Sequence, residues 1–104
     1  MDAVRAAIDE IDAEILRLLA QRQRCVLRAG QLKRGLGDEA VRAPERVRRV
    51  LAARREQAAR IDLDPDLAER VWRTMIEAFI ELEHGVARRP ASGADQGEVR
   101  IELS

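Results

Sequence analysis

The sequence has few residues of the kinds that build sheets, disulfides or membrane spans. Its 104 residues include one cysteine, one tryptophan and one phenylalanine, and no tyrosine. One cysteine cannot form an intramolecular disulfide, and few aromatics combined with abundant Ala, Leu, Arg and Glu are typical of helices. Because no apolar run approaches the length of a spanning helix or a signal sequence, we expect a cytoplasmic protein. The composition predicts an all-α fold.

The sequence also lacks an excess of charge of one sign and lacks the common catalytic motifs. Its 19 basic and 19 acidic residues cancel, so net charge favours neither nucleic acid nor a membrane surface as a partner. His84, which we expect on the surface, is the only histidine, and this excludes a multi-histidine metal site. There is no glycine-rich phosphate loop and no Ser-His-Asp arrangement. Any basic binding site must therefore be local.

The first predicted helix is too long for a protein of this size. Residues 2–34 contain no proline and predict one helix of about 32 residues and about 48 Å. A helix of this length cannot bury its whole apolar face against the rest of so short a chain, so we expect a second copy to cover it in an intertwined helical dimer. The apolar or small residues of this face recur every three or four positions and are Val4, Ile8, Ile11, Ile15, Leu18, Cys25, Ala29 and Leu32.

The rest of the chain predicts two further helices and a tail. Residues 35–43 contain two glycines and two acids and are expected to form a loop. A proline at the first position begins a second helix over 44–60, and an Asp-Pro capping pair begins a third helix that continues to about residue 89. Residues 90–104 are rich in small and polar residues, and we expect them to be disordered. The sequence therefore predicts one three-helix domain over 1–89.

Two cations on the first helix indicate a site. Arg22 falls inside the apolar stripe, and Lys33 follows eleven residues later, which places it within about 20° of the same face and about 16 Å further along the axis. Burying a guanidinium without a partner costs several kcal/mol, so a carboxylate of the protein or an anionic ligand must pair with it. The alternatives are a snorkelling Arg22 or an ion pair across a helical dimer, and a solvated Lys33 that complements the helix dipole.

Three other charged residues carry less information on their own. Arg46 lies in the first turn of the second helix, where the helix dipole favours anions, and this misplacement suits a ligand-binding role. Glu83 alone is typical of a residue at the edge of an apolar face. Arg5 lies about 25 Å before Arg22 along the helix and about 100° off its face, so these two side chains could serve one small ligand only across a dimer.

The opening segment VRAAIDEIDAEILRLLAQR, followed at fixed spacing by Lys33, by APERV and by a third helix that ends in Glu83, resembles the all-helical type II chorismate mutase family. The resemblance covers residues 2–89. It implies three helices per chain, an intertwined homodimer and two equivalent sites, each completed by a residue of the partner's long helix. It also implies that the substrate is a small cyclic dicarboxylate.

Carried over position by position, the resemblance gives each cation a role. Arg5 would reach into the partner's site, while Arg22 and Lys33 would hold the two carboxylates and the ether oxygen of a chorismate-like substrate. Arg46 matches the arginine that begins the family's second helix, and Glu83 matches the position that faces the ether oxygen, usually a glutamine. The family reaction is pericyclic, so the protein only folds the dianion into a reactive conformer and stabilises developing charge. No metal or organic cofactor is needed for it.

Two departures from the family pattern bear on the substrate. Chorismate mutases usually carry acids that hold the ring hydroxyl at the two positions that are Ala43 and Val47 here. The stretch APERV resembles the corresponding loop of isochorismate pyruvate lyases, and the mutases of 4-amino-4-deoxychorismate also have an atypical loop. The second departure is Glu83, because a glutamate must be protonated to donate a hydrogen bond to an ether oxygen.

The resemblance implies an enzyme, with Claisen rearrangement of chorismate to prephenate as the leading activity. Elimination of pyruvate from isochorismate and rearrangement of 4-amino-4-deoxychorismate are the alternatives within the family. An alternative of another class is a non-catalytic helical dimerisation module, in which Arg22 and Lys33 merely pair with acids of the partner helix.

Overall fold

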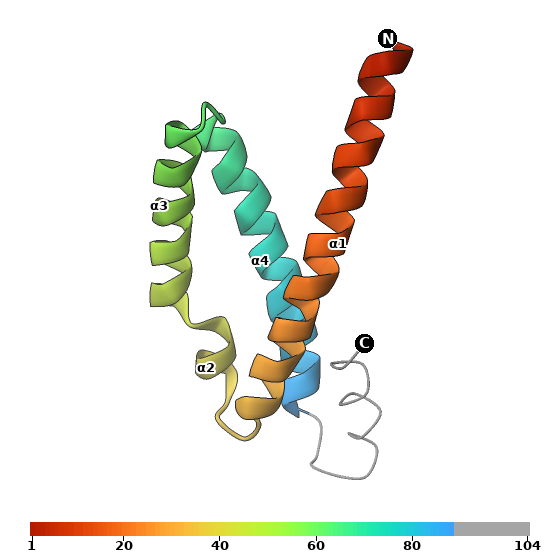
Figure 1. Ribbon diagram of the computed structural model, residues 1–104. Coiled ribbons are helices and arrows are strands. Elements are labelled where there is room, and N and C mark those ends of the chain that lie inside the picture. Colours follow the sequence, from red (N-terminus) through yellow and green to blue (C-terminus); the bar gives the residue numbers. More distant parts are fainter. Residues whose placement is uncertain (89–104) are drawn as a thin grey trace.

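The computed structural model describes residues 1–88, which are helical apart from short connections (Figure 1). The prediction of an all-α fold with three main helices, the first of them long, is confirmed. None of these helices is both long and apolar enough to cross a membrane. The predicted tail 90–104 lies outside the described residues. The elements are α1 (Asp2–Leu32), α2 (Asp38–Arg42), α3 (Pro44–Arg60) and α4 (Pro65–Arg88).

The short helix α2 corrects one prediction, because its residues were expected to form a loop. Asp38 and Glu39 lie in its first turn, where negative charge complements the helix dipole. Val41 is only 4% exposed, so α2 is anchored by packing as well as by local sequence. Ala43, with φ 40°, ends α2 in the left-handed region and precedes α3 directly. The chain therefore passes from α2 into α3 through a single residue.

The helices α3 and α4 form an antiparallel hairpin, and the C-terminal half of α1 packs against α4 (Figure 1). The predicted cap of α4 is confirmed, because Asp64 Oδ1 accepts hydrogen bonds from the backbone N–H groups of Asp66 at 2.9 Å and Leu67 at 3.4 Å. The N-terminal half of α1 diverges from the hairpin. This arrangement leaves an opening between α1 and the start of α4.

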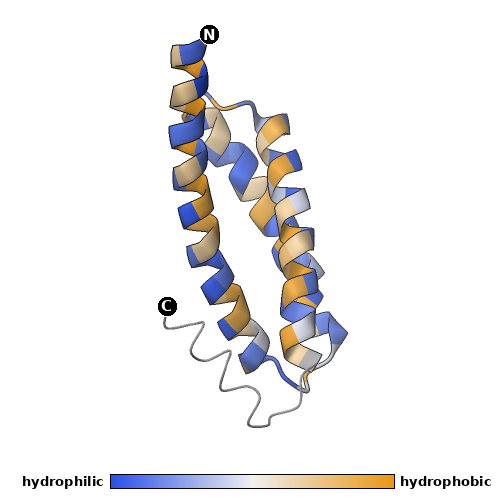
Figure 2. Ribbon diagram, turned by 90° about the vertical axis from the view of Figure 1, so that its right-hand side faces the viewer, coloured by the Kyte–Doolittle hydropathy of each residue, from blue (hydrophilic) through white to orange (hydrophobic). Residues whose placement is uncertain are grey.

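The core of the single chain is small and lies along α4. Its buried apolar residues are Leu27, Val41, Leu51, Ala58, Ala68, Ile76 and Val86. The predicted stripe of α1 is largely outside this core: Ile8 is 49% exposed and Ile11 58%, and hydrophobic positions continue along α1 to its N-terminal end (Figure 2). Cys25 and Leu32, which belong to the same predicted stripe, are also exposed in the single chain. The side of α1 that meets α4 carries Leu27 and Gly30 instead.

At Gly30 the helix α1 approaches α4 closely. A Cβ at this position would lie 3.0 Å from Cβ and Cγ1 of Val86 and 3.1 Å from the backbone oxygen of Glu83. A β-branched side chain and a helical backbone cannot move aside easily, so the overpacking outweighs the gain in helix propensity. We expect Gly30→Ala to lower the free energy of unfolding by about 1 kcal/mol in urea denaturation.

Gly85 provides the matched control for this substitution. It also lies inside a helix, but a Cβ at Gly85 would meet nothing within 4 Å. Gly85→Ala should therefore raise the free energy of unfolding by about 0.5–1 kcal/mol through helix propensity alone. Equal effects of the two substitutions would contradict the close packing of α1 on α4.

Candidate active site

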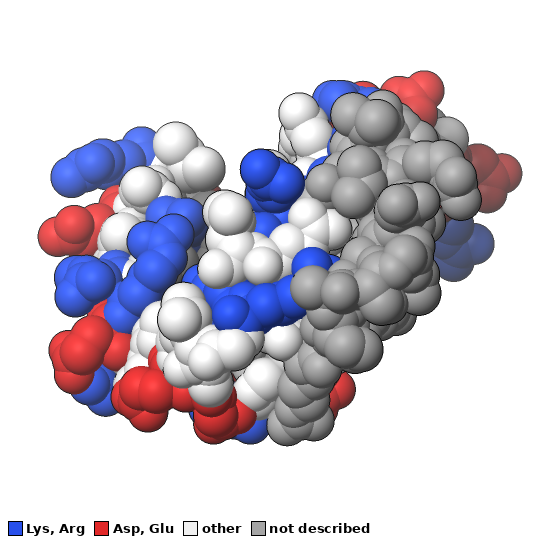
Figure 3. Space-filling model, turned by 90° about the horizontal axis from the view of Figure 1, so that it is seen from below, with Lys and Arg blue, Asp and Glu red and all other residues white. Residues whose placement is uncertain are grey.

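A cavity of about 140 Å³ lies between α1, α2, α3 and α4, and most of the charged side chains that line it are cations. Along its walls the described residues provide five cationic side chains and one acid, with apolar side chains between them. Figure 3, a view from below, shows Lys and Arg side chains gathered across the middle of this face, with Asp and Glu toward its edges. The charged lining residues are Arg22, Lys33, Arg42, Arg46, Arg54 and Glu83.

The structure brings together most of the residues that the sequence singled out. Besides Arg22, Lys33, Arg46 and Glu83, the small side chains of Ala43 and Val47 line the same cavity. Arg5 does not, because it lies seventeen residues before Arg22 on the exposed, diverging half of α1. Within one chain, the site is therefore built without Arg5.

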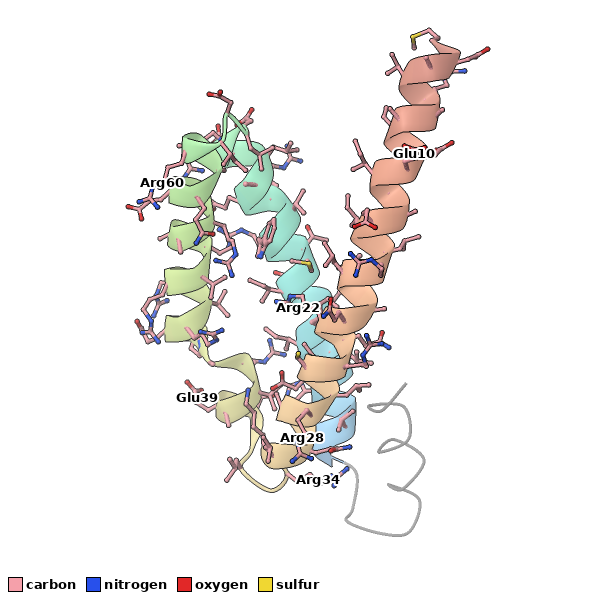
Figure 4. All side chains as sticks on the ribbon, in the orientation of Figure 1. Glu10, Arg22, Arg28, Arg34, Glu39 and Arg60 are labelled. Carbon is pink, nitrogen blue, oxygen red and sulfur yellow. The ribbon has the colours of Figure 1, made fainter. Side chains whose placement is uncertain are left out.

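Arg22 points from α1 toward α4 and is only partly exposed (Figure 4). Its guanidinium carbon lies 4.5 Å from the centre of the Phe79 ring, a cation–π distance. Its Nη1 is buried and has no hydrogen-bond partner among the described residues. Desolvation, and then the charges of Arg54 and Arg46, hold the pKa of Arg22 below its usual value. Arg22 is thus a cation in a site that favours the arrival of an anion.

Lys33 and Glu83 form an ion pair across the cavity, although they are 50 positions apart in the chain. Lys33 follows α1 directly, and its Nζ donates a hydrogen bond of 2.7 Å to Oε2 of Glu83 on α4. Glu83 is only 8% exposed. Lys33 is therefore more than a solvated residue at a helix end, and Glu83 is more than an edge residue, because each is the other's partner inside the cavity.

Two cations of the cavity were not singled out from the sequence. Arg42 lies at the end of α2 and pairs with Asp38 at 3.1 Å, so its charge is partly neutralised. Arg54 lies on α3, seven residues after Val47 and on the same helical face. This is the signal that identified Arg22, a cation in an otherwise apolar row, and it could have identified Arg54 in the same way.

The wall formed by the start of α3 carries no acid. Ala43 and Val47 present only small apolar side chains to the cavity. Glu45, which lies between these two residues in the chain, is exposed, pairs with Arg48 and does not line the cavity. Asp38 is engaged outside the cavity by Arg42 and by Nε2 of His84. His84 is 9% exposed, so the prediction of a surface position for this histidine is wrong: it joins α4 to α2.

The charge balance determines which ligands the cavity suits. Of the described residues, five cations face it and one acid, Glu83, which is already bonded to Lys33. Such a lining suits a small molecule with two negative charges, and it suits the stabilisation of negative charge that develops on a bound oxygen atom. Among the described residues the lining offers neither a nucleophilic thiol nor a histidine, so the arrangement suits binding and electrostatic catalysis.

Comparison with known proteins shows a family and a curated relative. The chain matches the family described as chorismate mutase type II over residues 4–84. It is also 37% identical, over 76 residues, to a T-protein of Enterobacter agglomerans. That match covers 73% of this chain and 20% of the relative, so the chain spans about a fifth of the relative's length. No solved structure matches the chain.

Proposed function

Because the chain belongs to the chorismate mutase type II family, we propose that it is an isomerase that converts chorismate into prephenate by a Claisen rearrangement. One observation carries this proposal: the partly desolvated and unpartnered guanidinium of Arg22 faces the same cavity as Lys33. A partly desolvated guanidinium near the charges of Arg54 and Arg46 is costly unless an anion binds to it. Chorismate, with its two carboxylates, is such a dianion.

The proposed mechanism uses charge and shape alone. Arg22 and Arg46 bind carboxylates and hold the enolpyruvyl side chain over the ring, so that the carbon atoms that will bond are close together. As the ether C–O bond breaks and the new C–C bond forms, the ether oxygen gains negative charge. Lys33 stabilises this charge by donating a hydrogen bond to the oxygen. No proton leaves the substrate and no covalent intermediate forms.

The excess of cations in the cavity lining also favours some of the family's substrates over others. 4-Amino-4-deoxychorismate carries an ammonium group on its ring, and no free carboxylate is found in the described lining to receive it. A hydroxyl at that position meets no such repulsion, which favours chorismate. The apolar wall at Ala43 and Val47 supports one second candidate, elimination of pyruvate from isochorismate, because this substrate carries its hydroxyl elsewhere on the ring.

A side-by-side assay with the three substrates tests the proposal. We expect prephenate from chorismate at the highest kcat/KM, and little amino-prephenate from 4-amino-4-deoxychorismate. Faster formation of salicylate and pyruvate from isochorismate would select the second candidate. Turnover of none of the three would overturn both.

We further propose that the active form is a homodimer in which α1 of one copy covers the other. The exposed stripe of α1 continues into an apolar groove between α1 and the start of α4, lined by residues that include Ile15, Leu19, Leu67, Val71 and Met75. An apolar surface of this extent is unusual on a monomer. A second α1 supplies a matching apolar stripe, and it would carry Arg5 toward the partner's cavity.

Charge placed in the stripe tests this dimer. We expect Ile11→Asp to convert the dimer into a monomer in analytical ultracentrifugation, because an unpaired carboxylate would have to be buried in the interface. Turnover should be lost with it, since Arg5 would no longer reach the partner's site. Ala13→Asp introduces the same charge on the opposite face of α1 and should leave both properties unchanged. A monomeric and active wild type would contradict the proposal.

A further inference from the structure

Arg54, which lines the cavity, is held in place by one contact with α4 and one with its own helix. Its guanidinium carbon lies 5.6 Å from the ring of Trp72 on α4, and its Nη1 donates a hydrogen bond of 3.1 Å to Oε1 of Gln57. Stacking uses the face of the guanidinium and leaves N–H groups at its edge available. Arg46 lies two turns away on the same helix, about 12 Å along the axis. Arg54 therefore occupies a separate part of the cavity wall.

In this position the positive charge of Arg54 acts on the guanidinium of Arg22. Of the charged groups around Arg22, Arg54 has the largest effect in lowering the pKa of the Arg22 guanidinium. Within residues 1–88 neither guanidinium forms an ion pair with a carboxylate, and Nη1 of Arg22 is buried without a hydrogen-bond partner. Two like charges held near each other without an anion are unfavourable. A carboxylate that binds between them removes the repulsion and supplies the missing acceptor.

We propose that Arg54 is a substrate-binding residue that, together with Arg22, grips one carboxylate of the bound dianion. The inference rests on the proposed function, whose site it deepens. Two planar guanidinium groups can offer paired N–H donors to the two oxygens of one carboxylate. Arg46 and Lys33 are then left for the second carboxylate and the ether oxygen. Arg54 therefore contributes to the preference of the site for dicarboxylates over monocarboxylates.

Kinetics of three variants test this role. Arg54→Met keeps an unbranched side chain against Trp72 but removes the charge, and we expect it to raise the KM for chorismate about 10- to 100-fold with a smaller change in kcat. Arg54→Lys keeps the charge without the planar fork and should recover part of the loss. Arg49→Met removes an exposed arginine of α3 outside the cavity and should leave KM unchanged.

A binding measurement separates this inference from the proposed activity. Succinate and butyrate, titrated into the full chain and followed by NMR, compare a dianion with a monoanion of similar size. We expect Arg54→Met to weaken succinate binding about tenfold and to affect butyrate less. If the wild type turns over none of the three substrates while this difference is found, the proposed function fails and the role of Arg54 stands. If chorismate is turned over and Arg54→Met leaves KM and succinate binding unchanged, the inference about Arg54 is overturned.

Discussion

Replacing Arg22 with methionine is expected to remove most of the turnover while it makes the fold more stable. The guanidinium of Arg22 has a buried Nη1 without a partner, and its charge is opposed by desolvation and by Arg54 and Arg46. Methionine fills a similar volume beside Phe79 and needs no hydrogen bond. The substitution therefore removes the cost of desolvation and of repulsion between like charges. Residues that suit a binding site often lower the stability of the fold in this way.

The two effects of Arg22→Met differ in sign and can be measured on one sample. We expect kcat/KM for chorismate to fall about 1,000-fold, the effect of losing a preorganised charged donor. The free energy of unfolding should rise by about 1 kcal/mol, a modest gain because the side chain is only partly buried. Urea denaturation of variant and wild type needs equal chain concentrations, because the unfolding of a dimer depends on concentration.

Arg28→Met is the matched control, since Arg28 is an exposed residue of α1 outside the cavity. It should change neither activity nor stability by a comparable amount. Should Arg22→Met instead dissociate the proposed dimer, in a parent protein that turns over none of the three substrates, Arg22 would be an interface residue. The dimerisation module would then be the better description of the chain.

The main helices could be predicted from the sequence because their signals are local. Proline at the start of α3 and the cap at Asp64 act within one helical turn, and both lie where they were expected. α2 was missed because a five-residue helix is not stable by itself. It depends on the burial of Val41 and on the contact of Asp38 with His84, residues that are far apart in the chain.

The candidate site was predictable to the extent that it depends on helical periodicity. An arginine in the apolar row of α1 identified Arg22, and the same spacing placed Lys33 on its side. Periodicity cannot tell which inner position faces a cavity and which faces the core, so it does not distinguish the cavity position of Arg54 from the core positions of α3. Nor can it tell which part of the apolar row of α1 is covered by the same chain. That depends on the close approach of Gly30 to Val86, which only the packing shows.

Replacing Lys33 with methionine is expected to remove turnover and, in contrast to Arg22→Met, to destabilise the fold. Lys33 donates the hydrogen bond that satisfies Glu83, a carboxylate only 8% exposed. Without it, Glu83 is a buried charge with no partner, and we expect the free energy of unfolding to fall by about 1–2 kcal/mol, a range that allows for the 30% exposure of the Lys33 side chain. kcat/KM for chorismate should fall about 1,000-fold.

The double variant Lys33→Met with Glu83→Gln separates these two losses. A neutral amide tolerates burial better than an unpaired carboxylate, so the double variant should regain most of the lost stability. It should not regain turnover, because no cation is left beside the ether oxygen of the substrate. Recovery of activity in the double variant would show that Lys33 acts only by neutralising Glu83. The proposed mechanism would then lose the cation that stabilises the ether oxygen.

Glu83→Gln alone tests what the acid contributes to the reaction. In the free site Glu83 accepts the hydrogen bond of Lys33, so a substrate must compete with this carboxylate for the lysine. Glutamine still offers an oxygen to Lys33, and its amide N–H groups can donate to the ether oxygen at any pH. We therefore expect Glu83→Gln to raise kcat/KM for chorismate about tenfold, the effect of roughly one hydrogen bond. A kcat/KM that the substitution leaves unchanged would remove Glu83 from the reaction and leave it as the partner that positions Lys33.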